Sequence, residues 1–470
     1  MSVKQEDIEM IVKQVISNIK NAKATNVIPS GSSFGTFQDM NEAIEAAKIA
    51  QKIVKKMTIE QREAVIKKIR EKTIENARAL AELGVEETGM GKVEHKILKH
   101  ELLANKTPGT EDIKTIAWSG DRGLTLVEMG PFGVIGSITP STNPSETILC
   151  NSIGMIAAGN TVVFNPHPGA IKVSLLAVKI VNEASIEAGG PENIVTTVFR
   201  PTLESCNILM KHKDIALIAA TGGPGVVTAA LSSGKRAIGA GAGNPPVVVD
   251  ETADLPKAAK DIIDGASFDN NLPCIAEKEV VAVKEITDEL MYYMVENGAY
   301  EITSAEAELL TKLVLINNKG KLSLNRDWIG KDAYKILRAL GMEASTDIRC
   351  IIFKGPKDHP LIIEELMMPI LGIVEVEDFD EAIEVAKLLE HGNRHSAHMH
   401  SRNIHNLTRL SREIDTAIFV KNAPSYAALG YLGEGYCTFT IASRTGEGLT
   451  STKSFTKSRR CVLADGLSIR

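Results

Sequence analysis

The feature that most restricts the fold of this chain is an alternation of apolar strand-like runs with helical segments over residues 130–240. The strand-like runs are residues 133–138, 159–164, 193–199 and 215–220. The helical segments between them are roughly residues 145–158, 169–188 and 203–212. Strands and helices that alternate through short connections predict an α/β fold with a parallel, doubly wound sheet.

The ends of these strands carry the first candidate binding residues, because such sheets bind ligands beyond the carboxyl ends of their strands. Thr139 and Pro140 follow the first strand, and His167 follows the second. Asn143 stands a few residues after the first strand. It is either a turn residue or a side-chain amide aimed into the crevice at the strand ends.

The fourth strand ends in a glycine-rich turn, Thr221-Gly222-Gly223-Pro224-Gly225, directly before a predicted helix. Glycines allow the backbone to approach a ligand closely, and a helix N-terminus favours a pyrophosphate. The spacing is not G-x-G-x-x-G, so the turn alone fits an ordinary strand-to-helix connection equally well.

Residues outside this stretch predict further layers. Residues 38–105 read as long amphipathic helices, and a helix is expected over 253–268. Strands expected for a second sheet are residues 247–250, 280–283, 313–316, 349–354, 373–376 and 418–420. Residues 124–128 alternate like half of a hairpin, and residues 436–441 also look like a strand.

The first twenty residues form a separate unit. One helical stripe is made by Ile8, Ile11, Val12, Val15, Ile16 and Ile19. Residues 21–37 read as a flexible linker rich in glycine and serine. A helix this short needs a partner for its apolar stripe, which is either the rest of the chain or another protein.

Cys274 is the candidate nucleophile. It stands between a glycine-rich run, residues 240–244, and the predicted strand 280–283. A thiolate attacks carbonyl carbons readily, but a lone free cysteine is more often a buried structural residue. The six cysteines show no CxxC spacing, so we expect a reducing cytosol and neither a zinc site nor a disulfide framework.

Charge and composition exclude other classes of function. The net charge of −6 is spread along the chain without a long basic run, so we expect no nucleic-acid or membrane partner. No apolar run is long enough for a transmembrane helix. The histidines His391, His395, His398 and His400 cluster in sequence, yet no adjacent cysteine or acid supports a metal site, and a packing role is favoured.

Five segments in order resemble the aldehyde dehydrogenase superfamily: residues 133–143, 159–163 and 221–225, the Cys274 stretch, and Glu365-Leu-Met-Met-Pro369. The runs 165–170, 220–225 and 239–244 are similar to those of the CoA-acylating branch. The chain most resembles the propionaldehyde and acetaldehyde dehydrogenases of bacterial microcompartments. In that comparison, residues 1–20 with their linker resemble an encapsulation helix, which implies docking to a shell protein in the microcompartment lumen.

The resemblance implies a division of the chain. Residues 38–112 and 130–240 would form a Rossmann-type dinucleotide-binding domain, and residues 241–435 an α/β catalytic domain. Residues 113–129 and 436–470 would form a small β arm used in homo-oligomers. Residues 1–20 would be the docking helix, and residues 21–37 the linker.

The resemblance also implies roles for individual residues. Cys274 would be the nucleophile, and the Asn143 amide with the Cys274 backbone N–H would hold the oxyanion. Glu365 would bind the nicotinamide ribose. The groove for NAD would be lined by Thr139, Pro140, His167, Thr221, Gly222 and Gly225. A thiohemiacetal on Cys274 would lose hydride to NAD and leave a thioester.

One departure from the hydrolytic branch indicates the acyl acceptor. Ala240 stands where hydrolytic members carry the glutamate that activates water, and residues 237–244 contain no carboxylate. Without a general base the thioester reacts slowly with water and can wait for a thiol, which predicts coenzyme A as co-substrate.

Two other hypotheses stay open at this stage. A hydrolytic aldehyde dehydrogenase would need another base, for example Glu277 or Glu279. A catalytically inactive structural component of an assembly is the third possibility. The sequence leaves open propionaldehyde against acetaldehyde, NAD against NADP, the oligomeric state and the physiological direction.

Overall fold

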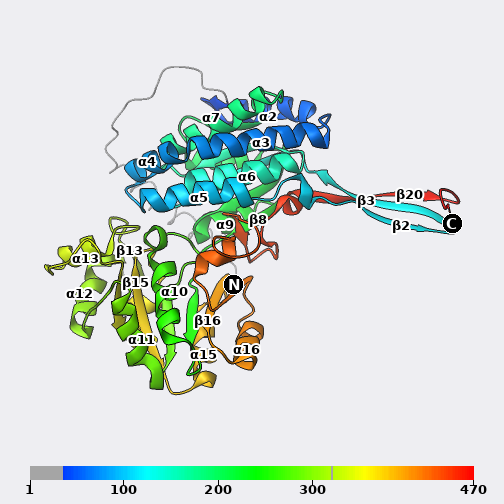
Figure 1. The fold of residues 1–470 in the computed structure, drawn as a ribbon. Helices are drawn as coiled ribbons and strands as arrows, with labels where there is room; N and C mark the ends of the chain where they lie inside the picture. The colour runs from blue at the N-terminus through cyan, green and yellow to red at the C-terminus, as the bar shows by residue number, and fades with distance from the viewer. Residues whose placement is uncertain (1–34, 319–320, 470) are drawn as a thin grey trace.

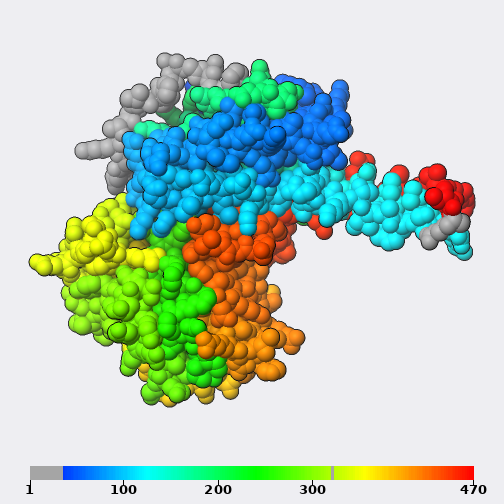
Figure 2. Space-filling view, viewed as in Figure 1, coloured from blue at the N-terminus to red at the C-terminus, as the bar shows by residue number. Residues whose placement is uncertain are grey.

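The computed structural model describes residues 35–318 and 321–469, which form two α/β units and a projecting β arm (Figure 1). The predicted docking helix, residues 1–20, and most of the linker lie outside the described residues. None of the described helices is both long enough and apolar enough to cross a membrane. In the space-filling view, the arm extends as a narrow projection away from both units (Figure 2).

The first unit contains a six-stranded sheet in the order β1-β6-β5-β4-β7-β8, with every pairing parallel. Its strands are β1 (Thr36–Phe37), β4 (Val134–Thr139), β5 (Thr161–Pro166), β6 (Val195–Val198), β7 (Ile215–Thr221) and β8 (Arg236–Ala240). The four predicted strands are therefore confirmed. Neither β1 nor β8 was predicted, because β1 has two residues and the short β8 contains both Arg236 and Gly239.

Helices cover both faces of this sheet (Figure 1). They are α2 (Met40–Val54), α3 (Ile59–Glu75), α4 (Ala77–Thr88), α5 (Val93–Lys106), α6 (Pro144–Ala157), α7 (Ile171–Glu187), α8 (Leu203–Lys211) and α9 (Pro224–Leu231). All fourteen residues of α6 are buried, as expected for a helix enclosed by other elements. Pro144 occupies its first turn, and Asn143 is its N-cap residue. Asn143 is therefore held at a fixed helix start.

The second unit contains a seven-stranded parallel sheet in the order β11-β14-β15-β10-β9-β16-β17. Its strands are β9 (Pro246–Val249), β10 (Glu279–Val283), β11 (Ala299–Glu301), β14 (Cys350–Lys354), β15 (Ile370–Val376), β16 (Ser396–His400) and β17 (Ile418–Lys421). The strand predicted at 313–316 belongs instead to a separate hairpin of β12 (Leu315–Asn318) and β13 (Lys321–Leu324).

Seven α-helices accompany the second sheet within the described residues. They are α10 (Leu255–Ser267), α11 (Lys284–Glu296), α12 (Ser304–Val314), α13 (Ala333–Ala339), α14 (Pro360–Ile363), α15 (Phe379–Leu389) and α16 (Ile404–Ile414). A one-turn 3-10 helix, η2 (Phe268–Asn271), follows α10 and leads to Cys274. The predicted helix over 253–268 is thus confirmed within two residues at its start.

The arm is a three-stranded antiparallel sheet of β2 (Ile116–Gly120), β3 (Gly123–Pro131) and β20 (Thr456–Ala464). The predicted hairpin is confirmed. The strand predicted at residues 436–441 is wrong, because that segment is irregular until Ile441. Cys437 and Ile441 are buried against the first unit, and Thr440 donates its hydroxyl to the Asn151 side chain. Residues 436–440 are therefore held by side-chain packing and side-chain hydrogen bonds and not by the backbone hydrogen bonds of a sheet.

Candidate active site

Cys274 follows a run of three residues in the left-handed region of backbone conformation. The φ angles of Asp269, Asn270 and Asn271 are 48°, 55° and 67°. Residues with a side chain rarely adopt this region, and the strain persists only where the surroundings enforce it. Asn270 donates to the Gly330 carbonyl at 2.8 Å, and Asn271 donates to the Glu277 carbonyl at 2.9 Å. The loop that presents the cysteine is therefore rigidly held.

Gly243 packs directly against this loop. A Cβ atom at Gly243 would lie 2.8 Å from the His395 Cγ and 3.0 Å from the Cys274 carbonyl oxygen. The first distance is shorter than real Cβ contacts and the second is tighter than most of them, so a side chain at this position would displace His395 or the loop of Cys274. The sequence suggested no function for the glycine run before β9. The structure shows that Gly243, within this run, is needed for close packing against the loop of Cys274.

The thiol of Cys274 is strongly biased toward its neutral form. Removal from water raises its pKa to about 12, the carboxylate of Glu365 adds to the rise, and the Lys278 ammonium opposes it. Burial likewise raises the pKa of Glu365, while Lys278 and the backbone of Gly243 lower it. The structure thus brings Cys274, Glu365, Lys278 and Gly243 into one electrostatic environment.

Asn143 reaches the same region from the first unit. Its Oδ1 accepts a hydrogen bond from Lys99 Nζ at 2.6 Å, and the same Nζ lies 2.5 Å from Asp269 Oδ2. The amide Nδ2 has only a long contact, 3.4 Å, to Thr142 Oγ1. An amide nitrogen carries two protons, so among the described residues at least one Nδ2 proton is left to donate to an oxyanion.

The sequence alone contained no argument for Lys99, although a signal exists. Lys96, Lys99, His100, Leu103 and Ala104 recur at helical spacing and are all buried on one face of α5. Lysines on the same stripe as leucine are unusual, since lysine is almost never fully buried unless it is paired. This spacing is therefore a sequence signal for a buried ion-pair cluster.

The predicted cofactor residues lie at the carboxyl ends of three neighbouring strands. Thr139 ends β4 and Pro140 follows it, His167 follows β5, and Thr221 ends β7. Because β4 pairs with both β5 and β7, these ends adjoin. His167 is exposed, and its Nδ1 accepts from the Gly169 N–H at 3.0 Å.

The glycine turn after β7 leaves a helix start open. Gly223 is the N-cap residue of α9 and supplies no side-chain cap, and Gly222 and Gly225 flank it. Thr221 Oγ1 lies 2.9 Å from Thr440 Oγ1, which ties the turn to the segment after residue 435. The exposed N–H groups of a helix start suit a pyrophosphate, so the residues present fit a dinucleotide here.

A narrow cavity borders the cysteine loop, with room of about 10 Å³, close to one water molecule. It is lined by Leu98, Lys99, Leu102, Phe268, Pro273, Ile275, Ser425, Tyr426, Leu429 and Tyr431. Pro273 and Ile275 are the chain neighbours of Cys274. The rings of Phe268 and Tyr426 have centroids 5.4 Å apart, and those of Tyr426 and Tyr431 are 5.2 Å apart. These aromatic residues were missed because they come from separate segments of the chain.

The histidine run forms part of the fold of the second unit. His395, His398 and His400 are buried, and His398 Nε2 lies 2.9 Å from the Ile275 carbonyl oxygen. His391 is exposed, with Nε2 2.8 Å from the Ile363 carbonyl oxygen. Across residues 35–318 and 321–469, no group of three His, Cys, Asp or Glu residues is arranged to hold a metal ion.

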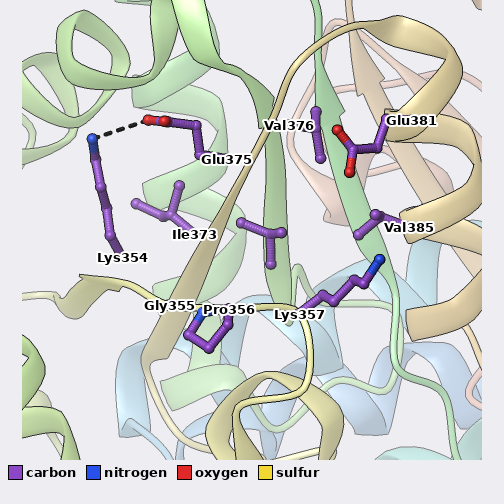
Figure 3. A pocket seen from close by; sticks show the side chains of 10 residues that line it. Lys354, Gly355, Pro356, Lys357, Ile373, Glu375, Val376, Glu381 and Val385 are labelled. Carbon is purple, nitrogen blue, oxygen red and sulfur yellow. Dashed lines mark hydrogen bonds and ion pairs between the residues drawn. The ribbon is translucent and has the colours of Figure 1, made fainter.

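A separate hollow of about 440 Å³ lies at the carboxyl ends of β14 and β15 (Figure 3). Lys354 Nζ lies 3.2 Å from Glu375 Oε2 across part of it, and Lys357 and Glu381 line it as well. Cys274 precedes β10 and so lies at the amino ends of the same parallel strands. The hollow is therefore distinct from the cysteine site.

Comparison with known proteins identifies the family. The profile of the aldehyde dehydrogenase family matches residues 14–435. The chain belongs to the aldehyde dehydrogenase family. The resemblance found in the sequence and the predicted fold class are thereby confirmed.

Two relatives within the family have names that describe CoA-acylating enzymes. The acetaldehyde dehydrogenase (acetylating) EutE of Salmonella typhimurium is 47% identical over 99% of both chains. The propanal dehydrogenase (CoA-propanoylating) of the same organism is 45% identical, also over 99% of both.

Solved structures agree with these relatives. A propionaldehyde dehydrogenase from the fucose utilisation bacterial microcompartment of Clostridium phytofermentans is 68% identical, with a TM-score of 0.91. The match covers 93% of this chain and 100% of that one. Rhodopseudomonas palustris propionaldehyde dehydrogenase, solved with bound CoA and an acylated cysteine, is 52% identical with a TM-score of 0.91. That match covers 93% of this chain and 99% of the other.

Proposed function

We propose that this chain is a CoA-acylating aldehyde dehydrogenase that oxidises a short-chain aldehyde to acyl-CoA with NAD as hydride acceptor. The observation that carries the proposal is the joining of Asn143 and the Cys274 loop through Lys99, in a site without a free carboxylate at residues 237–244. A nucleophile and an amide donor on either side of a carbonyl are the requirements of acyl transfer.

In the first half-reaction, the Cys274 thiol gives up its proton to solvent, its sulfur bonds to the aldehyde carbon, and the carbonyl oxygen becomes an oxyanion. Asn143 Nδ2 and the Cys274 backbone N–H donate to that oxygen, which is worth on the order of 3 kcal/mol per donor. NAD, when bound, supplies the hydride acceptor. Thr139, Pro140, His167 and the Thr221–Gly225 turn would line its groove, and Glu365 would hold its ribose.

In the second half-reaction, the thiolate of CoA attacks the thioester carbon, the bond from that carbon to the Cys274 sulfur breaks, and Cys274 leaves as a thiolate that then takes a proton from solvent. The site disfavours water as the attacking group. Ala240 ends β8 with no functional side chain. Burial raises the pKa of Glu277 to about 8 and that of Glu279 well above its ordinary value. Burial thus favours the protonated form of both carboxyl groups, and a protonated carboxyl group cannot act as the base that activates water.

The names of the relatives support propionaldehyde or acetaldehyde as the substrate and a bacterial microcompartment lumen as the location. Residues 1–20 would dock to a shell protein through their apolar stripe. The exposed β arm would pair subunits into a dimer or tetramer.

The test is NADH formation from propionaldehyde or acetaldehyde with and without CoA. We expect steady turnover only with CoA, and without CoA about one NADH per active site, because the thioester persists. Full turnover without CoA would contradict the proposal and favour hydrolysis. The Cys274→Ala variant should form no NADH; activity equal to wild type would exclude Cys274 as the nucleophile. A wild type inert with both aldehydes would favour a structural role.

A further inference from the structure

Four charged residues form a buried cluster between the two units. Lys96, Lys99, Glu146 and Asp269 are each no more than 3% exposed. Lys99 Nζ lies 2.7 Å from Glu146 Oε1 and 2.5 Å from Asp269 Oδ2, and Lys96 Nζ lies 3.1 Å from Asp269 Oδ2. Two positive and two negative charges balance. Taking such charges out of water is costly, and apolar side chains often replace them without loss of stability.

Lys99 is the member of the cluster that bonds to the side chain of Asn143. Its Nζ has Asn143 Oδ1, Asp269 Oδ2 and Glu146 Oε1 within hydrogen-bonding distance. An ammonium has three protons and no acceptor, so it bonds only to the oxygen of an amide. The Asn143 amide is therefore fixed with Oδ1 toward Lys99 and Nδ2 turned away from it.

Lys96 provides the natural comparison. It contacts Asp269 and donates to the Thr142 carbonyl at 3.2 Å, but no bond joins it to the Asn143 side chain. The cluster thus contains two lysines of similar burial and charge, of which Lys99 alone donates to the Asn143 amide. Burial lowers the pKa of Lys99, but the Asp269 and Glu146 carboxylates raise it above its ordinary value, so the side chain remains an ammonium.

We propose that Lys99 is a positioning residue for catalysis: it orients the Asn143 amide toward the substrate oxyanion and braces it on the loop that carries Cys274. The inference rests on the proposed function and adds a residue to it. Asp269 precedes Cys274 by five positions, so one Nζ atom connects the two halves of the oxyanion site. A freely rotating amide would present its oxygen as often as its nitrogen, and its oxygen would repel the oxyanion.

The experiment is a double-mutant cycle on the full chain with propionaldehyde, NAD and CoA. We expect Asn143→Ala to lower kcat about 100- to 1,000-fold. Lys99→Met should lower kcat about 10- to 100-fold in the wild-type background. In the Asn143→Ala background it should lower kcat no more than about 3-fold, because the amide it orients is gone. The KM for NAD should stay within about 2-fold of wild type.

Lys96→Met is the matched control. It removes a charge from the same cluster without a bond to Asn143, so we expect it to lower kcat by similar factors in both backgrounds. Equal factors for Lys99→Met in the two backgrounds would overturn the inference. So would a folded Lys99→Met enzyme with the kcat of wild type.

A second measurement separates positioning from a structural role. Alkylation of Cys274 by iodoacetamide forms no oxyanion, so Lys99→Met should keep its rate within about 3-fold of wild type. The rate is followed on the Cys274 peptide, because the exposed Cys461 also reacts. A loss of alkylation parallel to the loss of kcat would show that Lys99 only supports the loop.

Folding failure would not leave the question open. If Lys99→Met does not fold, Lys99→Met with Glu146→Gln is compared with Glu146→Gln alone, since this removes one charge of each sign. The two proposals also fail in different ways. A wild type without aldehyde activity contradicts the proposed function, whereas an active wild type with no coupling between Lys99 and Asn143 contradicts this inference alone.

Discussion

At the scale of single residues, Gly243 shows how the absence of a side chain shapes the surroundings of the nucleophile. A Cβ atom at this position would lie 2.8 Å from the His395 Cγ and 3.0 Å from the Cys274 carbonyl oxygen. Gly241, two residues earlier, has no atom within 4 Å of the position that a Cβ would take. The same run therefore contains one glycine required by packing and one that tolerates a methyl group.

We predict that Gly243→Ala lowers kcat for aldehyde oxidation by at least about 10-fold, since small displacements of reacting groups can cost about 100-fold. Gly241→Ala should retain kcat within about 2-fold, because open space surrounds it. Steady-state kinetics with propionaldehyde, NAD and CoA measure both, and circular dichroism checks that each variant folds. Equal kcat values for the two variants would contradict the packing argument.

The sequence singled out Cys274 and Asn143 as candidates by their residue types and their places between predicted elements, and the family resemblance supplied the roles expected of them. It could not predict Lys99, because the partner of Lys99 in the cysteine loop is 170 residues away along the chain. His395 is similar: its ring meets Gly243 only after two strands of the second sheet have been placed side by side. Such contacts depend on tertiary structure. In the sequence they leave only an indirect signal, such as a lysine among the apolar residues on one face of a predicted helix.

At the scale of elements, the residue at the start of α9 affects both the stability of the helix, through capping, and the proposed binding of the NAD pyrophosphate. Gly223 is the N-cap residue of α9, lies in extended conformation and has open space around a Cβ position. Aspartate and asparagine cap helices better than glycine by a few tenths of a kcal/mol. A negative charge at this end also stabilises the helix through its interaction with the helix dipole. The same charge would repel a pyrophosphate bound to the same N–H groups.

We therefore predict that Gly223→Asp and Gly223→Asn each raise the free energy of unfolding by at most a few tenths of a kcal/mol. The melting temperature of both variants should equal or slightly exceed that of wild type. Only Gly223→Asp should raise the KM for NAD, by about 10-fold or about 1.4 kcal/mol. Asparagine is the control because it has the same size and capping oxygen without the charge. Thermal melts and NAD titrations give the two readouts; equal KM values would place the pyrophosphate elsewhere.

The elements themselves were predictable to the extent that their residues were uniformly apolar. Strands β4, β5 and β7 are apolar runs between turns, and all were predicted. Strand β16 was missed because its buried positions include His398 and His400, whose side chains are satisfied within the fold. Residues 436–440 were wrongly predicted as part of a strand, because their alternation of polar and apolar residues serves packing and hydrogen bonding against α6.

At the scale of the whole molecule, the two sheets face the site with opposite ends. The first contributes the carboxyl ends of its strands, where α/β sheets bind ligands. The second contributes its amino ends, through the loop before β10 that carries Cys274. This arrangement leaves the arm of β2, β3 and β20 outside both cores, with Ile116, Trp118, Val462 and Leu463 exposed.

An exposed apolar surface on a thin sheet indicates an interface between subunits, because contiguous apolar patches on a monomer are small. We predict that Trp118→Ser with Val462→Ser lowers the oligomer mass measured by light scattering at micromolar protein. The control is Ile404→Ser, which removes an equally exposed apolar side chain, 69% accessible, from α16 in the second unit. That variant should keep the mass of wild type. Neither arm residue contacts the cysteine loop, so the dissociated enzyme should still form NADH. An unchanged oligomer mass in the double variant would exclude the arm as the interface.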